Sequence, residues 1–155
     1  MSSKQKLFGI ILVTSVGFTV GLGASQTSDP AVPGVYSLVE VNGEKLPAVS
    51  WTNKSNGERC KTETLGGALL LDSKGQWASL VTEREVCLHE DGSETAHEKA
   101  SLMFTGSYKS SGNQITLQDG ASADQAVLTG DRFVLTVVGV GVFEGQTTEY
   151  VLRRD

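Results

Sequence analysis

The sequence predicts an all-β protein: a single small antiparallel up-and-down β-barrel of about eight strands, after an N-terminal signal peptide. Short runs rich in β-branched and aromatic residues recur from Gly34 onward, separated by Gly, Asn, Asp and Ser. The 18 glycines and 3 prolines suit a chain with many turns. No segment after the amino terminus sustains helical periodicity. A two-sheet β-sandwich is the alternative architecture.

The amino terminus has the pattern of a secretory signal. Lys4 and Lys6 precede an apolar run at residues 7–20, and small residues follow. A membrane anchor is the competing interpretation, but spanning a bilayer takes about 20 apolar residues. This run is shorter and contains two threonines and a serine. We therefore expect residues 1–24 to be a signal peptide cleaved near Ala24, and the mature protein to be secreted or periplasmic.

Two regions follow the predicted cleavage site. Residues 25–33 are polar and contain two prolines, which is typical of a flexible linker. Residues 34–155 then form the predicted barrel domain. Removing Lys4 and Lys6 from the 13 basic residues leaves 11 against 18 acidic residues, a formal charge of −7. Such an acidic surface disfavours nucleic acid and anionic membranes as partners.

Eight segments of the domain have the composition of strands. Tight turn sequences separate most neighbours, so consecutive strands should pair antiparallel, and closing the sheet would remove its exposed edges. Alternation of apolar and polar residues is clearest in the segments that contain Phe104 and Phe133. The predicted strands are Val35–Val41, Thr64–Leu71, Gln76–Cys87, Lys99–Lys109, Gln114–Gln118, Gln125–Thr129, Arg132–Val138 and Thr147–Arg153.

The two cysteines, Cys60 and Cys87, predict one disulfide, because an even cysteine count in an exported domain usually means pairing. A hairpin with a two-residue loop at residues 73–74 would place them directly opposite each other. A type I turn with a bulge at Gly75 would shift the pairing by one residue, and a second bulge at residues 66–67 would restore it. Two cysteines without suitably spaced histidines do not form a structural zinc site, and we predict no metal.

Several short motifs resemble those of small secreted bacterial lipocalin-like (calycin-type) domains. They include Gly34-Val-Tyr36-Ser-Leu38 at the start of the domain, Gly106-Ser-Tyr108, and the closing segment 150–154. Lipocalins open with Gly-x-Trp and close with an arginine that stacks on that tryptophan. The resemblance implies that Tyr36 replaces the tryptophan and that Arg153, or alternatively its neighbour Arg154, closes the barrel by a cation–π contact.

Five aromatic residues in predicted strands are candidates for lining a ligand cavity. Alternatively they fill the core, because side chains can fill an eight-stranded barrel completely. The five are Tyr36, Trp77, Phe104, Tyr108 and Phe133.

Two polar features are candidate sites of chemistry. Residues 89–98 include two histidines and several carboxylates, which either bind a divalent cation or form a solvated loop; their spacing does not match a calcium loop. Glu83 and Glu85 share a strand face, as a glycosidase carboxylate pair would, or else they form a charged strand end. Nucleophile motifs are lacking, so we predict no catalytic residues, no cofactor and no enzymatic activity.

The sequence thus predicts an exported non-enzymatic binding protein that holds a small hydrophobic ligand inside a barrel. The alternative is a protein-binding module, such as an exported inhibitor or an envelope assembly factor, whose arm at residues 25–33 inserts into a partner.

Overall fold

The computed structural model describes residues 31–55, 58–98 and 101–155, so the predicted signal peptide at residues 1–24 and most of the linker lie outside it. Strands dominate, and the helical segment among the described residues is one 3-10 turn, η1 (Gly141–Phe143). The strands are β1 (Gly34–Val41), β2 (Glu44–Lys45), β3 (Ala48–Ser55), β4 (Glu58–Leu71), β5 (Gln76–Leu88), β6 (Glu94–Glu98), β7 (Leu102–Ser111), β8 (Gln114–Asp119), β9 (Ser122–Thr129), β10 (Arg132–Val138) and β11 (Thr147–Arg154).

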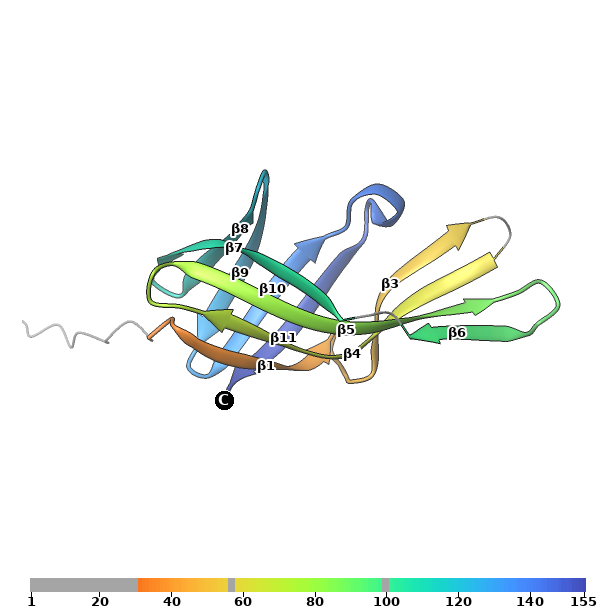
Figure 1. Ribbon diagram of the computed structural model, residues 1–155, viewed down its shortest axis with the longest axis horizontal. Coiled ribbons are helices and arrows are strands. Elements are labelled where there is room, and N and C mark those ends of the chain that lie inside the picture. The colour runs from red at the N-terminus through yellow and green to blue at the C-terminus, as the bar shows by residue number, and fades with distance from the viewer. Residues whose placement is uncertain (1–30, 56–57, 99–100) are drawn as a thin grey trace, which may run out of the picture.

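Eight of these strands close into an antiparallel barrel (Figure 1). The spatial order is β1, β11, β10, β9, β8, β7, β5 and β4, and pairing of β1 with β4 completes the ring. In that closing pair, Gly34 to Ser37 lie opposite Leu71 to Ala68. The predicted up-and-down barrel is therefore confirmed, and the two-sheet alternative is excluded by the continuous ring of pairings.

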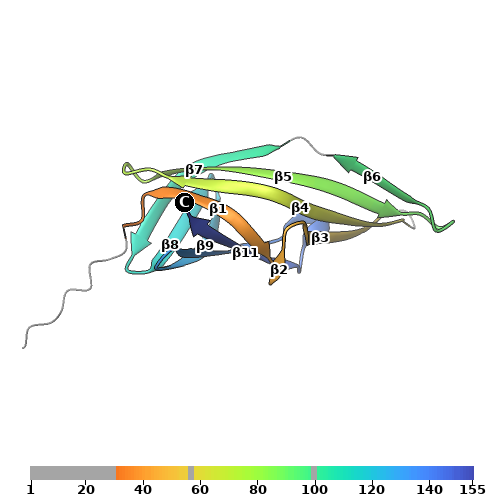
Figure 2. The ribbon, with the colours of Figure 1, turned by 90° about the horizontal axis from the view of Figure 1, so that it is seen from below.

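Three further strands, β2, β3 and β6, were not predicted. β3, the first half of β4, the second half of β5 and β6 form a four-stranded extension that projects beyond the barrel (Figures 1 and 2). The second predicted strand consequently begins at Glu58 rather than Thr64. Residues 58–64 are mostly charged and polar, and such a composition resembles a loop unless tertiary pairing makes it a strand.

The β4–β5 hairpin has the two register shifts that the cysteine spacing required. Gly75 takes a positive φ of 79° in the turn, and Leu71 pairs with Trp77. A bulge between Thr64 and Gly66 then moves the register by one residue, and this brings Cys60 opposite Cys87. The predicted disulfide is present, with an S–S distance of 2.07 Å. In the chain-entropy model, closing this loop stabilises the fold by about 3 kcal/mol.

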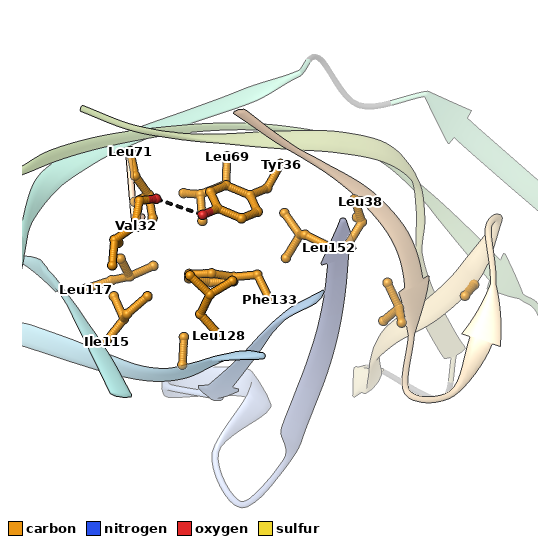
Figure 3. Close-up of a cluster of buried hydrophobic side chains, with 13 residues drawn as sticks. Val32, Tyr36, Leu38, Leu69, Leu71, Ile115, Leu117, Leu128, Phe133 and Leu152 are labelled. Carbon is orange, nitrogen blue, oxygen red and sulfur yellow. Dashed lines mark hydrogen bonds between the residues drawn. The ribbon is translucent and has the colours of Figure 1, made fainter. Parts of the chain in front are cut away.

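One end of the barrel, the base, is filled by apolar side chains (Figure 3). Tyr36 and Phe133 are both fully buried, and their ring centroids are 5.2 Å apart. The Tyr36 hydroxyl donates a hydrogen bond to the carbonyl oxygen of Val32 at 2.7 Å, which satisfies the phenol in an apolar setting. The side chains packed around them include Leu71, Ile115 and Leu128.

The arginine at the base is Arg154, and the prediction of Arg153 was wrong. Tyr36 and Arg154 are directly opposed on β1 and β11, so their side chains lie on the same face of the sheet. The guanidinium carbon of Arg154 lies 5.3 Å from the centre of the Tyr36 ring. Its Nη2 donates to the Tyr36 hydroxyl at 3.0 Å and to the Pro33 carbonyl oxygen at 2.7 Å. Arg153 points outward and pairs with Asp131 at 3.1 Å.

Replacing this arginine should destabilise the fold far more than replacing its neighbour. We expect Arg154→Ala to lower the free energy of unfolding by about 2 kcal/mol, since a cation–π contact and charge-assisted hydrogen bonds are lost. Arg153→Ala removes an exposed ion pair and should cost less than about 0.5 kcal/mol. Urea titration of both variants measures the difference, and equal losses would contradict the assignment.

A second packing constraint lies at Gly106 on β7. The Trp77 indole nitrogen donates to the Gln118 carbonyl oxygen at 3.2 Å, and it passes over Gly106. A Cβ atom at Gly106 would lie 2.0 Å from that oxygen and 2.7 Å from the indole nitrogen. Only glycine lets the tryptophan cross this strand.

Gly106→Ala should therefore reduce stability by about 2 kcal/mol, because the added methyl group displaces the indole or the strand. Gly66→Ala is the matched control: a Cβ there meets nothing within 4 Å. Thermal unfolding of the two variants makes the comparison, and the tryptophan emission, to which Trp77 contributes, should shift only in Gly106→Ala. Equal losses in both variants would show that the close approach is unimportant.

Candidate ligand-binding site

Above the filled base, the barrel encloses a cavity of about 300 Å³. Its floor consists of buried side chains such as Leu69 and Leu117, which are 2% and 3% exposed. Its mouth includes Phe104, which is 43% exposed, and residues beside the β8–β9 turn. This volume is at the lower end of the range for small-molecule pockets. The aliphatic lining residues are Leu38, Ala68, Leu69, Val81, Leu117, Leu135, Val137 and Leu152, and the aromatic ones are Trp51, Trp77, Phe104 and Tyr150.

The cavity also has two carboxylates, Asp119 on β8 and Asp124 on β9. Strand alternation places them there: the inward-facing row of β8 contains Ile115, Leu117 and Asp119, and Leu117 lies opposite Asp124. Ser122, opposite Asp119, lines the cavity as well. The mouth on this side of the barrel is therefore polar and acidic.

The environment of Asp124 disfavours its charged form. Partial burial raises the pKa of this carboxyl above its usual value, and the nearby negative charge of Asp119 raises it further. An aspartate on the outward face of the same strand would not be desolvated in this way. The fold thus holds a carboxylate where its ionisation costs stability.

Aromatic side chains line the same cavity as the two carboxylates. Burial raises the pKa of the Tyr150 phenol, and the charge of Glu83 raises it further, so the phenol remains protonated. Trp51 extends from β3, and its ring lies 5.3 Å from that of Phe143 in η1. Gln146 donates to the Thr52 carbonyl oxygen at 2.7 Å, which ties the β10–β11 loop to β3. The extension thereby contributes one wall of the mouth.

The five predicted lining aromatics have different positions. Trp77 and Phe104 line the cavity. Tyr36 and Phe133 belong to the filled base, and the Tyr108 hydroxyl donates to the Asp72 carbonyl oxygen at 2.6 Å. Sequence reasoning missed Trp51 and Tyr150. Trp51 is in a strand that was not predicted, whereas the alternation of β11 could have indicated Tyr150.

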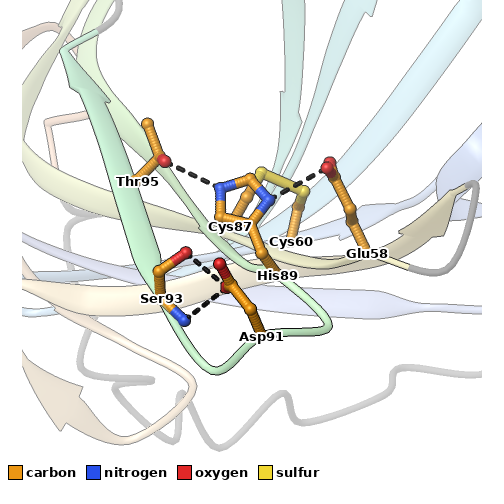
Figure 4. Close-up of polar contacts among 7 residues, drawn as sticks. All are labelled: Glu58, Cys60, Cys87, His89, Asp91, Ser93 and Thr95. Carbon is orange, nitrogen blue, oxygen red and sulfur yellow. Dashed lines mark hydrogen bonds and ion pairs between the residues drawn. A yellow bond between two sulfur atoms is a disulfide. The ribbon is translucent and has the colours of Figure 1, made fainter.

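The polar cluster at residues 89–98 comprises the β5–β6 turn, part of which Figure 4 shows, and the strand β6 that follows it. The His89 ring is held between Glu58, at 2.9 Å from Nδ1, and Thr95, at 2.7 Å from Nε2. Asp91 accepts hydrogen bonds from the backbone amide and the hydroxyl of Ser93. These contacts account for His89 and Asp91 as turn-stabilising groups.

A possible metal-ligand group lies next to this hairpin end. Glu58, Cys60 and Cys87 have ligand atoms within 4.8 Å of one another. The two cysteines are joined in the disulfide, so they offer no thiolates to a metal ion.

Glu83 and Glu85, the candidate carboxylate pair, lie in different environments. Glu83 is 8% exposed and lies close enough to Tyr150 to affect its pKa. Glu85 lies further along β5 in the extension, opposite His97 of β6.

No family model, curated protein or solved structure matches the chain. Within the described residues, no helix is long and apolar enough to cross a bilayer.

The raised pKa of Asp124 predicts a specific pH dependence. Ionisation costs more in the folded chain than in the unfolded one, so stability should fall as pH rises from the ordinary aspartate value of 3.8 through the raised pKa. Asp124→Asn removes this cost. The variant should be more stable than the parent protein at neutral pH, and the gain should vanish below the ordinary value.

Urea titrations of parent and variant across this pH range provide the measurement. Asp131→Asn is the control, because Asp131 is exposed at the base of the barrel and pairs with Arg153. A destabilised Asp124→Asn at neutral pH would show that the carboxylate makes favourable contacts that outweigh its desolvation.

Proposed function

We propose that the protein is an exported, non-enzymatic, lipocalin-like carrier that binds a small, mainly apolar molecule inside its barrel. The observation that carries this proposal is the division of the interior into a filled base and a hollow upper half. An eight-stranded barrel can be packed solid, but here a cavity remains above the packed base. The remaining 300 Å³ is lined largely by aliphatic and aromatic side chains, which suits an apolar ligand.

Two further features support this assignment. Arg154 stacks on Tyr36 at the base, which is the arrangement that the lipocalin resemblance implied for the first and last strands. The Cys60–Cys87 disulfide suits an oxidising compartment, in line with the predicted signal peptide and a secreted or periplasmic location.

Filling the cavity tests the proposal. N-phenyl-1-naphthylamine, a neutral apolar dye that fluoresces in apolar surroundings, should bind the purified protein saturably. Ser79→Phe places a bulky ring in the cavity and should weaken binding by about tenfold or more, equivalent to roughly 1.4 kcal/mol. Leu80→Phe is the matched control on the outer face of the same strand and should bind like the parent.

Folding of both variants is checked by far-ultraviolet circular dichroism. Absence of saturable dye binding to the parent, or equal binding by both variants, would overturn the proposal that the barrel interior is the binding site.

A further inference from the structure

The charged groups of the cavity are of one sign. Asp119 and Asp124 line it, whereas none of the described lysine, arginine or histidine side chains does. The basic residues are elsewhere: Arg153 and Arg154 at the base, and Lys54, Arg59 and Lys61 along a groove on the extension. A bound anion would therefore face carboxylates with no cation in the cavity to compensate.

Asp119 and Asp124 are on the inward faces of their strands, whereas carboxylates that only aid solubility would be on the outward faces. The inward rows of β8 and β9 are otherwise apolar where they are buried, with Ile115, Leu117, Ala126 and Leu128. Residues of the outward rows, such as Gln118 and Gln125, already face solvent. Placing Asp124 on the inner row incurs desolvation and repulsion from Asp119. A positively charged ligand group between them would offset both effects.

Aromatic faces supply the second element of cation recognition. Trp51, Trp77, Phe104 and Tyr150 line the same cavity as the two carboxylates. Aromatic rings attract cations through their quadrupole, and tryptophan does so most strongly. Apolar side chains below them, such as Leu69 and Leu152, would cover a hydrocarbon body.

From this combination we propose that the ligand is a cationic amphiphile: an apolar molecule that carries a protonated amine or a quaternary ammonium group. The hydrocarbon part lies against the aliphatic floor, and the ammonium group lies among the aromatic rings near Asp119 and Asp124 at the mouth. This inference rests on the proposed carrier function and specifies the chemical class of its ligand.

Three probes with the same eight-carbon chain test the proposal by calorimetric titration: octyltrimethylammonium, octanol and octanoate. We expect the ammonium probe to bind about tenfold more tightly than the alcohol, which corresponds to roughly 1.4 kcal/mol. Octanoate should bind more weakly than the alcohol because the carboxylates repel it. The preference for the ammonium probe should shrink as salt concentration rises.

The variant Asp119→Asn/Asp124→Asn keeps the side-chain volumes and removes both charges. It should lose most of the ammonium preference while binding octanol like the parent protein. Asp131→Asn, which removes one charge at the other end of the barrel, is the control and should keep the preference. An unchanged preference in the double variant would overturn the role of the carboxylates.

The outcomes separate this inference from the carrier proposal. If octanol and the neutral dye bind but the ammonium probe binds no more tightly than octanol, the cationic class is wrong and the carrier function stands. If octanoate binds most tightly, the charge argument is reversed and the class is also wrong. If none of the probes and not even the neutral dye binds, the carrier function itself fails.

Discussion

The pairing of β1 with both β11 and β4 is the constraint on which the rest of the structure depends. Tyr36 sits at this junction, opposite Arg154 on one side and Leu69 on the other. Closing the ring there brings β1 and β11 together, and both strands contribute side chains to the same base. Side chains packed around Tyr36 and Phe133 fill the base, and the cavity lies above them.

Patterns that depend on local periodicity could be predicted from the sequence. The barrel strands and their antiparallel order follow from alternation and turn residues, and the disulfide follows from the even cysteine count. The sequence left the cysteine register open between two alternatives, and the bulge between Thr64 and Gly66 is what brings Cys60 opposite Cys87. Arg153 was preferred over Arg154 because a motif does not state which face a residue takes. The pairing of Tyr36 with Arg154 decides this, and it becomes visible only when the strands are aligned.

The extension and the cavity could not be predicted from the sequence of single strands, because both depend on contacts between strands. Residues 58–64 become a strand because β3 and β5 pair with them from both sides. Trp51 reaches the cavity mouth only because β3 folds back against η1. Whether an inward-facing aromatic residue packs in the base or lines the cavity likewise depends on its position along the barrel axis. Tyr36 and Phe133 alternate inward just as Trp77 does, yet they lie at the packed end.

The energetic cost of the acidic mouth is the strongest physical reason to assign it a role. A side chain that serves only stability would be apolar at the inward position of Asp124, since Ala126, the next inward residue of β9, and Leu117, which lies opposite on β8, are apolar and buried. A fold that keeps mutually repelling carboxylates in a partly desolvated site is less stable than it could be, and such losses are characteristic of binding sites. The packed base and the disulfide provide the stability that lets the barrel tolerate this loss.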